Sequence, residues 1–170
     1  MSNSGYEFER ETGDSLRAIE GTYVHKLVDT HAFQYCPMCE ARLNIILPKQ
    51  PSDYLVVYRG HPIFIECKSS RNPISYNIKY IAVHQLEDAF AVEKSGAIYY
   101  FVISMRKPRN MEAYVLRPQQ LAQVIANMTT KAAVRWSEIA AHGLSLDRDM
   151  HNQIWMGWEA ILNEKTDHAL

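Results

Sequence analysis

The feature that most constrains the fold is a nearly continuous apolar run over residues 97–104, Ala-Ile-Tyr-Tyr-Phe-Val-Ile-Ser. A strand of this composition is typical of the centre of a sheet that is covered on both faces. Residues 82–94 precede it and predict a helix that ends at Ser95-Gly96. Residues 54–58 and 63–68 predict two strands that are joined by a turn into a β-hairpin.

Further elements are predicted on both sides of this central part. Helices are expected over residues 5–20, 118–128 and parts of 131–142 and 151–164, and strands over 22–28 and 112–116. The remainder is expected to be irregular over 31–52, a polar loop over 69–80 and a basic turn over 106–110. This order predicts an α/β or α+β fold with one sheet flanked by helices. A chain of 170 residues has the usual size of one domain, so we expect a single domain over residues 1–170.

Composition excludes several classes of protein. Hydrophobic residues make up 47% and charged residues 22% of the chain, which argues against a disordered, collagenous or coiled-coil protein. No stretch reaches 18 uninterrupted apolar residues, and the first residues lack the basic and apolar regions of a signal peptide. An odd count of three cysteines does not form a complete disulfide framework. We therefore expect a cytoplasmic protein with reduced thiols and no membrane association.

Charge is distributed unevenly along the chain. Residues 59–110 carry 8 Lys/Arg against 4 Asp/Glu, whereas the segments before and after them are net acidic. An ordinary solvated surface would explain this pattern. The alternative is a local basic patch that faces an anionic partner such as nucleic acid.

The predicted hairpin places two carboxylates close together. With Gly60-His61 at the centre of the turn, Glu66 faces Leu55 and Lys68 faces Asp53. Asp53, Glu66 and Lys68 then share one face, because side chains alternate along a strand. Diagonal Cβ atoms lie about 7–8 Å apart, a spacing at which two carboxylates can hold one Mg²⁺ ion. A salt bridge at the rim of the sheet is the alternative interpretation.

The same residues resemble the bipartite motif of the PD-(D/E)XK nucleases, since Pro51-Ser-Asp53 is followed after 12 residues by Glu66-Cys-Lys68. One family within this superfamily, the RecU-type Holliday junction resolvases, is resembled along nearly the whole chain. The matching segments, in the expected order, are Gly5-Tyr-Glu-Phe-Glu9, Ser52-Asp-Tyr54, Tyr58-Arg-Gly60, Asn77-Ile78, His84-Gln85, Gly96-Ala-Ile98 and Ser137-Glu-Ile-Ala-Ala-His-Gly143. With Arg10, the first segment also resembles the Gly-x-x-x-Glu-Arg of archaeal resolvases.

This resemblance implies a restriction-endonuclease-like fold, with a central mixed β-sheet flanked by helices. It implies a Mg²⁺-dependent endonuclease, with Mn²⁺ as an alternative metal, that nicks opposing strands of a four-way DNA junction. Asp53 and Glu66 would be metal ligands together with the backbone carbonyl of Cys67, and Lys68 would lie beside the attacking water. Glu9 would approach from the first helix, and Gln85 would bond the water or the scissile phosphate. The alternative for Glu9 and for Gln85 is an exposed helical side chain without a role in the site.

The resemblance also implies branched DNA as the partner and a homodimer, which suits a symmetric junction. Contacts to phosphates are expected from the basic middle of the chain, where each residue alone would be an ordinary surface charge. The candidates are Arg71, Lys79, Arg106, Lys107 and Arg109.

The chain departs from the family between residues 31 and 50. RecU-type enzymes carry a basic stalk there, whereas residues 31–44 hold a single cation, Arg42. We therefore expect a short insertion around residues 31–50 in place of a stalk. Cys36 and Cys39 have the spacing of half a zinc site, but a complete site needs four ligands, and a plain turn is the alternative.

Three other functions remain open at this point. The chain would be another PD-(D/E)XK nuclease acting on flaps or duplex DNA, a catalytically inactive DNA-binding module, or a zinc-stapled interaction domain. Trp136, Trp155 and Trp158 are expected to pack in the core rather than stack on bases.

Overall fold

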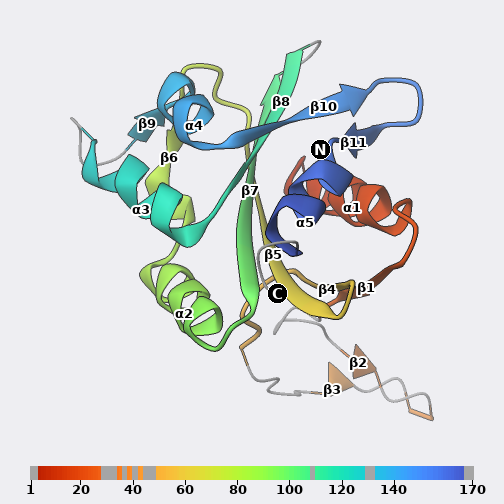
Figure 1. Cartoon of the computed structure of the whole chain (residues 1–170). Helices are drawn as coiled ribbons and strands as arrows, with labels where there is room; N and C mark the ends of the chain where they lie inside the picture. The colour runs from red at the N-terminus through yellow and green to blue at the C-terminus, as the bar shows by residue number, and fades with distance from the viewer. Residues whose placement is uncertain are drawn as a thin grey trace.

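A seven-stranded mixed sheet forms the centre of the computed structural model, which describes residues 4–27, 34–35, 38–39, 42–43, 49–107, 110–128 and 133–166. The strand order across the sheet is β1-β4-β5-β7-β8-β10-β11 (Figure 1). Its strands are β1 Thr22–Lys26, β4 Tyr54–Tyr58, β5 His61–Ser70, β7 Ile98–Lys107, β8 Asn110–Leu116, β10 Leu144–Asp149 and β11 Ile154–Met156. β5 and β7 are parallel, and the other neighbours are antiparallel.

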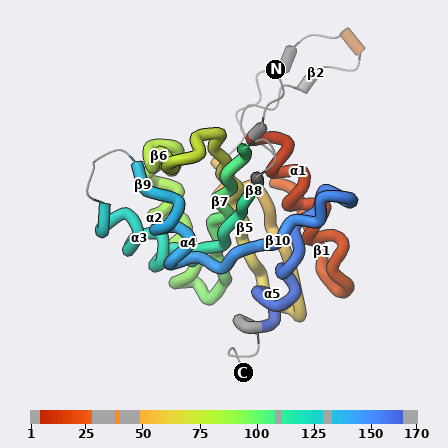
Figure 2. The backbone as a smooth tube through the Cα atoms, turned by 90° about the horizontal axis from the view of Figure 1, so that it is seen from above, coloured from red at the N-terminus to blue at the C-terminus, as the bar shows by residue number. Residues whose placement is uncertain are grey.

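Helices cover both faces of this sheet. One face carries α1 (Ser4–Arg17) and α5 (Trp158–Thr166), and the other carries α2 (Val83–Lys94), α3 (Pro118–Ala126) and α4 (Trp136–His142). The two groups lie on opposite sides of β7 (Figures 1 and 2). The prediction of a mixed α/β sheet flanked by helices is confirmed.

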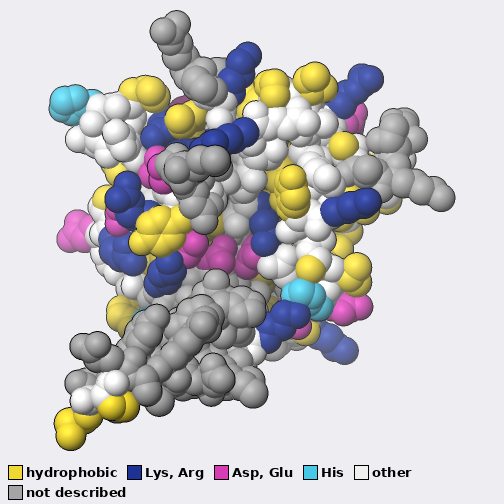
Figure 3. All heavy atoms as spheres, turned by 180° about the vertical axis from the view of Figure 1, so that it is seen from behind, with side chains coloured by type: hydrophobic (Ala, Val, Ile, Leu, Met, Phe, Trp, Pro, Cys, Tyr) yellow, Lys and Arg dark blue, Asp and Glu magenta, His cyan; other side chains and the backbone are white. Residues whose placement is uncertain are grey.

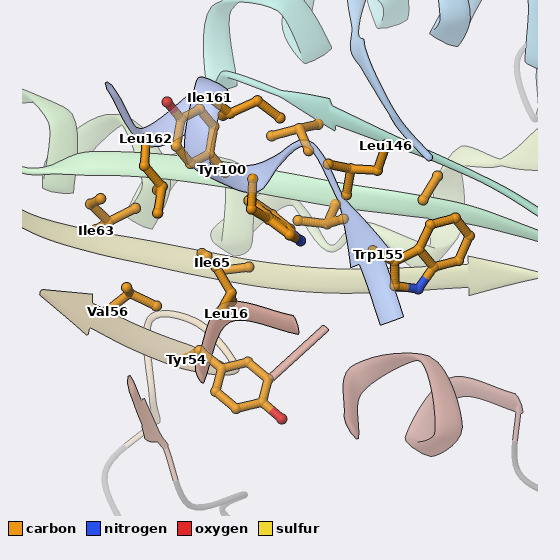
Figure 4. Close-up of a cluster of buried hydrophobic side chains, with 14 of the residues drawn as sticks. Leu16, Tyr54, Val56, Ile63, Ile65, Tyr100, Leu146, Trp155, Ile161 and Leu162 are labelled. Atoms are coloured by element: carbon orange, nitrogen blue, oxygen red, sulfur yellow. The ribbon is translucent and has the colours of Figure 1, made fainter. Parts of the chain in front are cut away.

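The alternation of β7 explains the two cores. Tyr100 and Val102 belong to the cluster beneath α1 and α5, whereas Phe101 and Ile103 belong to the cluster beneath α2, α3 and α4. The residues predicted as a central strand are thus buried on both faces, as their composition requires. Figure 4 shows the first cluster, in which Trp155 lies on the same side as Leu146, whereas Ile161 and Leu162 of α5 lie toward Ile63 and Tyr100. The predicted core positions of the three tryptophans are confirmed, with exposed fractions of 6% or less.

The hairpin of β4 and β5 has a different register from the one expected. Tyr58 pairs with His61, so the turn consists of Arg59 and Gly60. Both turn residues have positive φ, 49° and 83°, which is the geometry of a tight hairpin turn compatible with strand twist. The expected centre at Gly60-His61 was therefore wrong, and the pairing is shifted by two residues. An even shift leaves every side chain on its face.

Several elements were not foreseen. The expected polar loop at 69–80 contains the end of β5, the strand β6 (Ser75–Asn77) and the 3-10 helix η1 (Ile78–Tyr80). β6 pairs with β9 (Ala133–Arg135) in a small sheet of its own. Of the expected basic turn at 106–110, residues 106–107 end β7 and Asn110 begins β8. β10 lies where no element was predicted, and β11 lies within the range 151–164, where part was expected to be helical.

A second small sheet lies apart from the main one, formed by β2 (Gln34–Tyr35) and β3 (Arg42–Leu43) (Figures 1 and 2). It falls in the predicted insertion, most of which lies outside the described residues. None of the helices in the described part of the chain combines the length and apolar character needed to cross a lipid bilayer.

Candidate active site

The three motif residues meet where β4 begins. Glu66 and Lys68 lie on β5 and face α2, since the residues between and before them, Ile65 and Cys67, pack toward α1. Asp53 immediately precedes β4, and its Oδ2 accepts a hydrogen bond of 2.7 Å from the backbone N–H of Cys67. The observed register points Asp53 toward Glu66 rather than toward Lys68 as expected.

Glu66 is the centre of the site. Its side chain is 5% exposed, and its Oε1 lies 2.6 Å from Nζ of Lys68. The same oxygen accepts a hydrogen bond of 2.5 Å from Nε2 of Gln85. Gln85 in turn accepts a bond of 3.0 Å from the backbone N–H of Ala82 through Oε1, which caps the first turn of α2. The start of α2 is therefore tied to the acidic pair.

Burial and mutual repulsion disfavour the charged forms of both carboxylates. Removal from water raises the pKa of Asp53 to about 7, and the charge of Glu66 adds to this effect. Burial also raises the pKa of Glu66, against the opposing attraction of Lys68. Two carboxylates share one lysine here, so the pair carries more negative charge than its described neighbours neutralise.

Glu9 approaches the pair from α1, as predicted. Its carboxylate lies 2.8 Å from Nζ of Lys26 at the end of β1. The hydroxyl of Tyr54 donates a bond of 3.0 Å to the backbone carbonyl of Glu9 and fixes the helix against the sheet. A Cβ atom at Gly13 would lie 2.6 Å from that hydroxyl, so this contact requires glycine there. The charge of Glu9 raises the pKa of both Asp53 and Glu66.

The donor set fits a magnesium ion. Mg²⁺ binds through one or two carboxylates and keeps several of its waters. Asp53 and Glu66 supply two carboxylates, and no larger group of His, Cys, Asp or Glu that could hold a metal occurs among the described residues. The N–H of Cys67 points at Asp53, and the carbonyl of a strand residue points to the same side as its N–H. That carbonyl therefore faces the pair, whereas the partly buried Cys67 side chain packs toward α1, where removal from water raises the pKa of its thiol.

The residues predicted to contact DNA differ in their exposure to solvent. Arg71, Lys79 and Lys107 are exposed, and Arg109 lies outside the described residues. Arg106 was expected at the surface, but its side chain is 5% exposed and lies 2.5 Å from the Glu11 carboxylate. Arg106 is thus a buried ion-pair partner, and the prediction that it contacts DNA lacks the exposure it needs. Figure 3 shows Asp and Glu side chains near the middle of one face, with Lys and Arg side chains on both sides of them.

Sequence reasoning missed Lys26, the partner of Glu9. Lys26 lies within the predicted strand 22–28 and ends the observed β1. The next residue, Leu27, donates a backbone bond of 2.9 Å to the carbonyl of Asp53, a pairing that the sequence alone does not reveal. Cys39 is exposed, and Cys36 lies outside the described residues, so the zinc hypothesis stays a prediction.

Two curated proteins resemble this chain in sequence. The protein is 29% identical over 103 residues to the Holliday junction resolvase RecU of Shouchella clausii (61% of this chain and 49% of that protein). It is 40% identical over 53 residues to the RecU of Bacillus pumilus (31% of this chain and 26% of that protein). The chain thus spans about half the length, or less, of these curated relatives.

A solved structure shares the fold. The Holliday junction resolvase Hjc of Archaeoglobus fulgidus superposes with a TM-score of 0.52 at 15% identity, over 82% of this chain and 94% of that one. The predicted restriction-endonuclease-like fold is confirmed. Residues 37–157, about 70% of the chain, match the sequence model of RecU, recombination protein U. With the motif residues gathered at one site within this match, the chain belongs to the RecU family.

Proposed function

We propose that the protein is a Mg²⁺-dependent endonuclease that resolves four-way DNA junctions by paired nicking. The observation that carries the proposal is the carboxylate pair of the buried Glu66 and the partly buried Asp53, with Lys68 in contact with Glu66. Two carboxylates largely removed from water are costly in their charged forms and are stabilised by a bound cation. Membership in the RecU family and the fold shared with an archaeal resolvase support the same activity.

Each residue has a defined role in this proposal. Asp53, Glu66 and the carbonyl of Cys67 would hold the metal, which supplies an acidified water and stabilises charge on the phosphate. Lys68, 18% exposed, would present its ammonium group to the water or to the phosphate from beside Glu66. Gln85 keeps Oε1 of Glu66 in place through its amide. Glu9 would act from outside this group, as a water partner.

Paired nicking requires two active sites at one junction. A homodimer would present two copies related by a two-fold axis, which suits a symmetric branched substrate. Exposed Arg71, Lys79 and Lys107 would contact phosphates without selecting a sequence. A cytoplasmic location remains the expectation from the sequence.

The test compares wild-type protein with Asp53→Asn, Lys68→Ala and a matched control, Asp14→Asn. Asp14 is a carboxylate of the same size whose side chain is 54% exposed on α1. Each protein is incubated with a labelled four-way junction, a flap and a linear duplex, in Mg²⁺, Mn²⁺ or EDTA. We expect symmetric nicks on the junction, more than about 100-fold slower in the two site variants and unchanged in the control.

Two results would contradict the proposal. Equal cleavage of flap or duplex would support a different nuclease of the superfamily, for which the single cation in the sequence of residues 31–44 is the favouring observation. Junction binding without cleavage in either metal would support a DNA-binding module.

A further inference from the structure

Two large apolar side chains are exposed beside the candidate active site. Tyr80 ends η1 and is 57% exposed, and Val83 begins α2 and is 76% exposed. Large exposed apolar groups that cluster together mark interaction surfaces more often than single scattered ones do. Tyr80 and Val83 are separated by two residues, and we call them the apolar step.

The apolar step is held rigidly. The Oδ1 of Asn77 accepts a bond of 3.1 Å from the backbone N–H of Lys79 and caps η1. The N–H of Ile81 donates a bond of 2.9 Å to the carbonyl of Ile78 at the other end of the turn. The ring of Tyr80 lies edge-on to the buried ring of Tyr76, with centroids 6.0 Å apart. An aromatic ring fixed in this way offers contact area with little loss of conformational freedom.

The apolar step is continuous with the catalytic residues. Val83 lies two residues before Gln85, whose amide bonds Glu66 at 2.5 Å. Gln85 also accepts the N–H of Ala82, so the backbone between Tyr80 and Val83 is bonded directly to a residue of the site. Ala82, which lies between Tyr80 and Val83, is therefore two hydrogen bonds away from Glu66, and a substrate at Glu66 would extend toward the apolar step.

Charge in this segment favours nucleic acid over a protein partner. Arg71 and Lys79 are the exposed charges between Cys67 and Leu86, Lys68 being paired with Glu66, and the exposed Glu87 follows one helical turn after Val83. A surface that combines cations with an aromatic ring matches a phosphate backbone with unstacked bases. Regular duplex DNA does not expose base faces, but the branch point of a junction does.

We infer that Tyr80 and Val83 contact unstacked bases at the branch point and thereby set the preference for branched over duplex DNA. This inference rests on the proposed function. Tyr80 would stack on one unpaired base. Val83 would occupy the space that opens where the adjacent base has moved out of the stack. The phosphates would remain with Lys79 and the other exposed cations.

The experiment measures binding in EDTA, where no cleavage occurs, for a four-way junction and a linear duplex of the same sequence. The proteins are wild type, Tyr80→Ser, Val83→Ser, Tyr80→Phe and the control Met150→Ser. Met150 lies in the turn between β10 and β11 and is 68% exposed. We expect Tyr80→Ser and Val83→Ser to weaken junction binding about tenfold with duplex binding unchanged, and Tyr80→Phe and Met150→Ser to match wild type.

A second readout uses 2-aminopurine next to the branch point, whose fluorescence responds to stacking. We expect wild type and Tyr80→Phe to change it on binding, and Tyr80→Ser to change it less. Equal losses on junction and duplex, or no loss on either, would overturn the inference. A shift of Tyr80→Ser from dimer to monomer in sedimentation, with fluorescence unaffected, would assign the apolar step to a second copy of the chain. Failure of the proposed function is distinguishable. Loss of junction selectivity would appear as equal binding of junction and duplex by wild type, and loss of catalysis alone would leave this binding measurement in EDTA unaffected.

Discussion

Two buried acidic sites lie on opposite faces of the same sheet and differ in how their charge is balanced. On the α1 face, Glu11 is 7% exposed, and its carboxylate contacts Arg106 at 2.5 Å and Arg148 at 2.9 Å. The indole N–H of Trp155 lies 3.3 Å from the same carboxylate. On the α2 face, Glu66 is buried to a similar degree with one cation, Lys68, and with Asp53 beside it.

The difference separates a structural charge from a functional one. A buried carboxylate with two guanidinium partners has its hydrogen-bonding capacity filled, and it joins α1 to β7 and the β10–β11 hairpin. Two carboxylates with one lysine retain capacity for a further cation, and the pKa of Asp53 rises to about 7 in its absence. Equal burial therefore does not imply equal roles, and the count of charges decides between them.

The largest expected effect comes from making one substitution at both sites. Glu11→Gln should destabilise the protein by about 3–5 kcal/mol, because Arg106 and Arg148 would lose their buried counter-charge. Glu66→Gln should stay within about 1 kcal/mol of wild type without metal, because it relieves repulsion with Asp53. Denaturant unfolding at pH 8 in EDTA measures both. Equal losses would show that the two carboxylates have the same structural role.

The next effect is stabilisation by Mg²⁺. Any ligand that binds the folded state stabilises it, by about 2.7 kcal/mol at a concentration 100-fold above Kd. We expect this in wild type and in Asp14→Asn, and its loss in Asp53→Asn. Thermal unfolding over a Mg²⁺ titration measures it. An undiminished shift in Asp53→Asn would place the metal away from the acidic pair.

The pH dependence without metal should be smaller. A native pKa of about 7 for Asp53, above its ordinary value of 3.8, means that the folded state binds this proton more tightly than the unfolded chain does. Stability in EDTA should therefore fall as pH rises toward 7, by up to about 2 kcal/mol over two pH units. Asp53→Asn should flatten this part of the profile. Unfolding midpoints from pH 5 to 8 test the difference, and parallel profiles would contradict it.

Local sequence features predicted the residues of the site correctly as a group, but they did not predict the register of the β4–β5 hairpin. The alternation of β5 placed Glu66 and Lys68 on one face, and the motif spacing kept Asp53 with them. The register was wrong because Arg59 adopts positive φ next to Gly60, which few non-glycine residues do. The predicted register differs from the observed one by two residues, an even number, so the site residues stayed on the correct face although their pairing changed.

The Glu11 site could not be predicted in this way. Glu11, Arg106 and Arg148 are separated by about 95 and 137 positions from the first to each of the others. Their meeting depends on how α1 and the β10–β11 hairpin pack on the sheet, and sequence reasoning predicted no strand over 144–156. Arg106 follows an apolar strand in a basic stretch, so its composition suggested a surface cation. Only tertiary contacts distinguish such a cation from a buried partner.

The smallest effect distinguishes two functions of Gln85. Gln85→Ala removes both the cap of α2 and the donor to Glu66, and should cost about 1 kcal/mol at any pH. Gln85→Glu keeps an oxygen for the N–H of Ala82 but adds a third carboxylate beside Glu66. The neighbouring carboxylates should raise the pKa of the added group, so the loss should be slight at pH 5 and larger at pH 8. Unfolding of both variants at both pH values in EDTA tests this, with Mg²⁺ added to offset the loss at pH 8. If Gln85→Glu lowered the free energy of unfolding equally at both pH values, the amide would be only a helix cap. The carboxylates of Asp53 and Glu66 would then exert no electrostatic effect on residue 85.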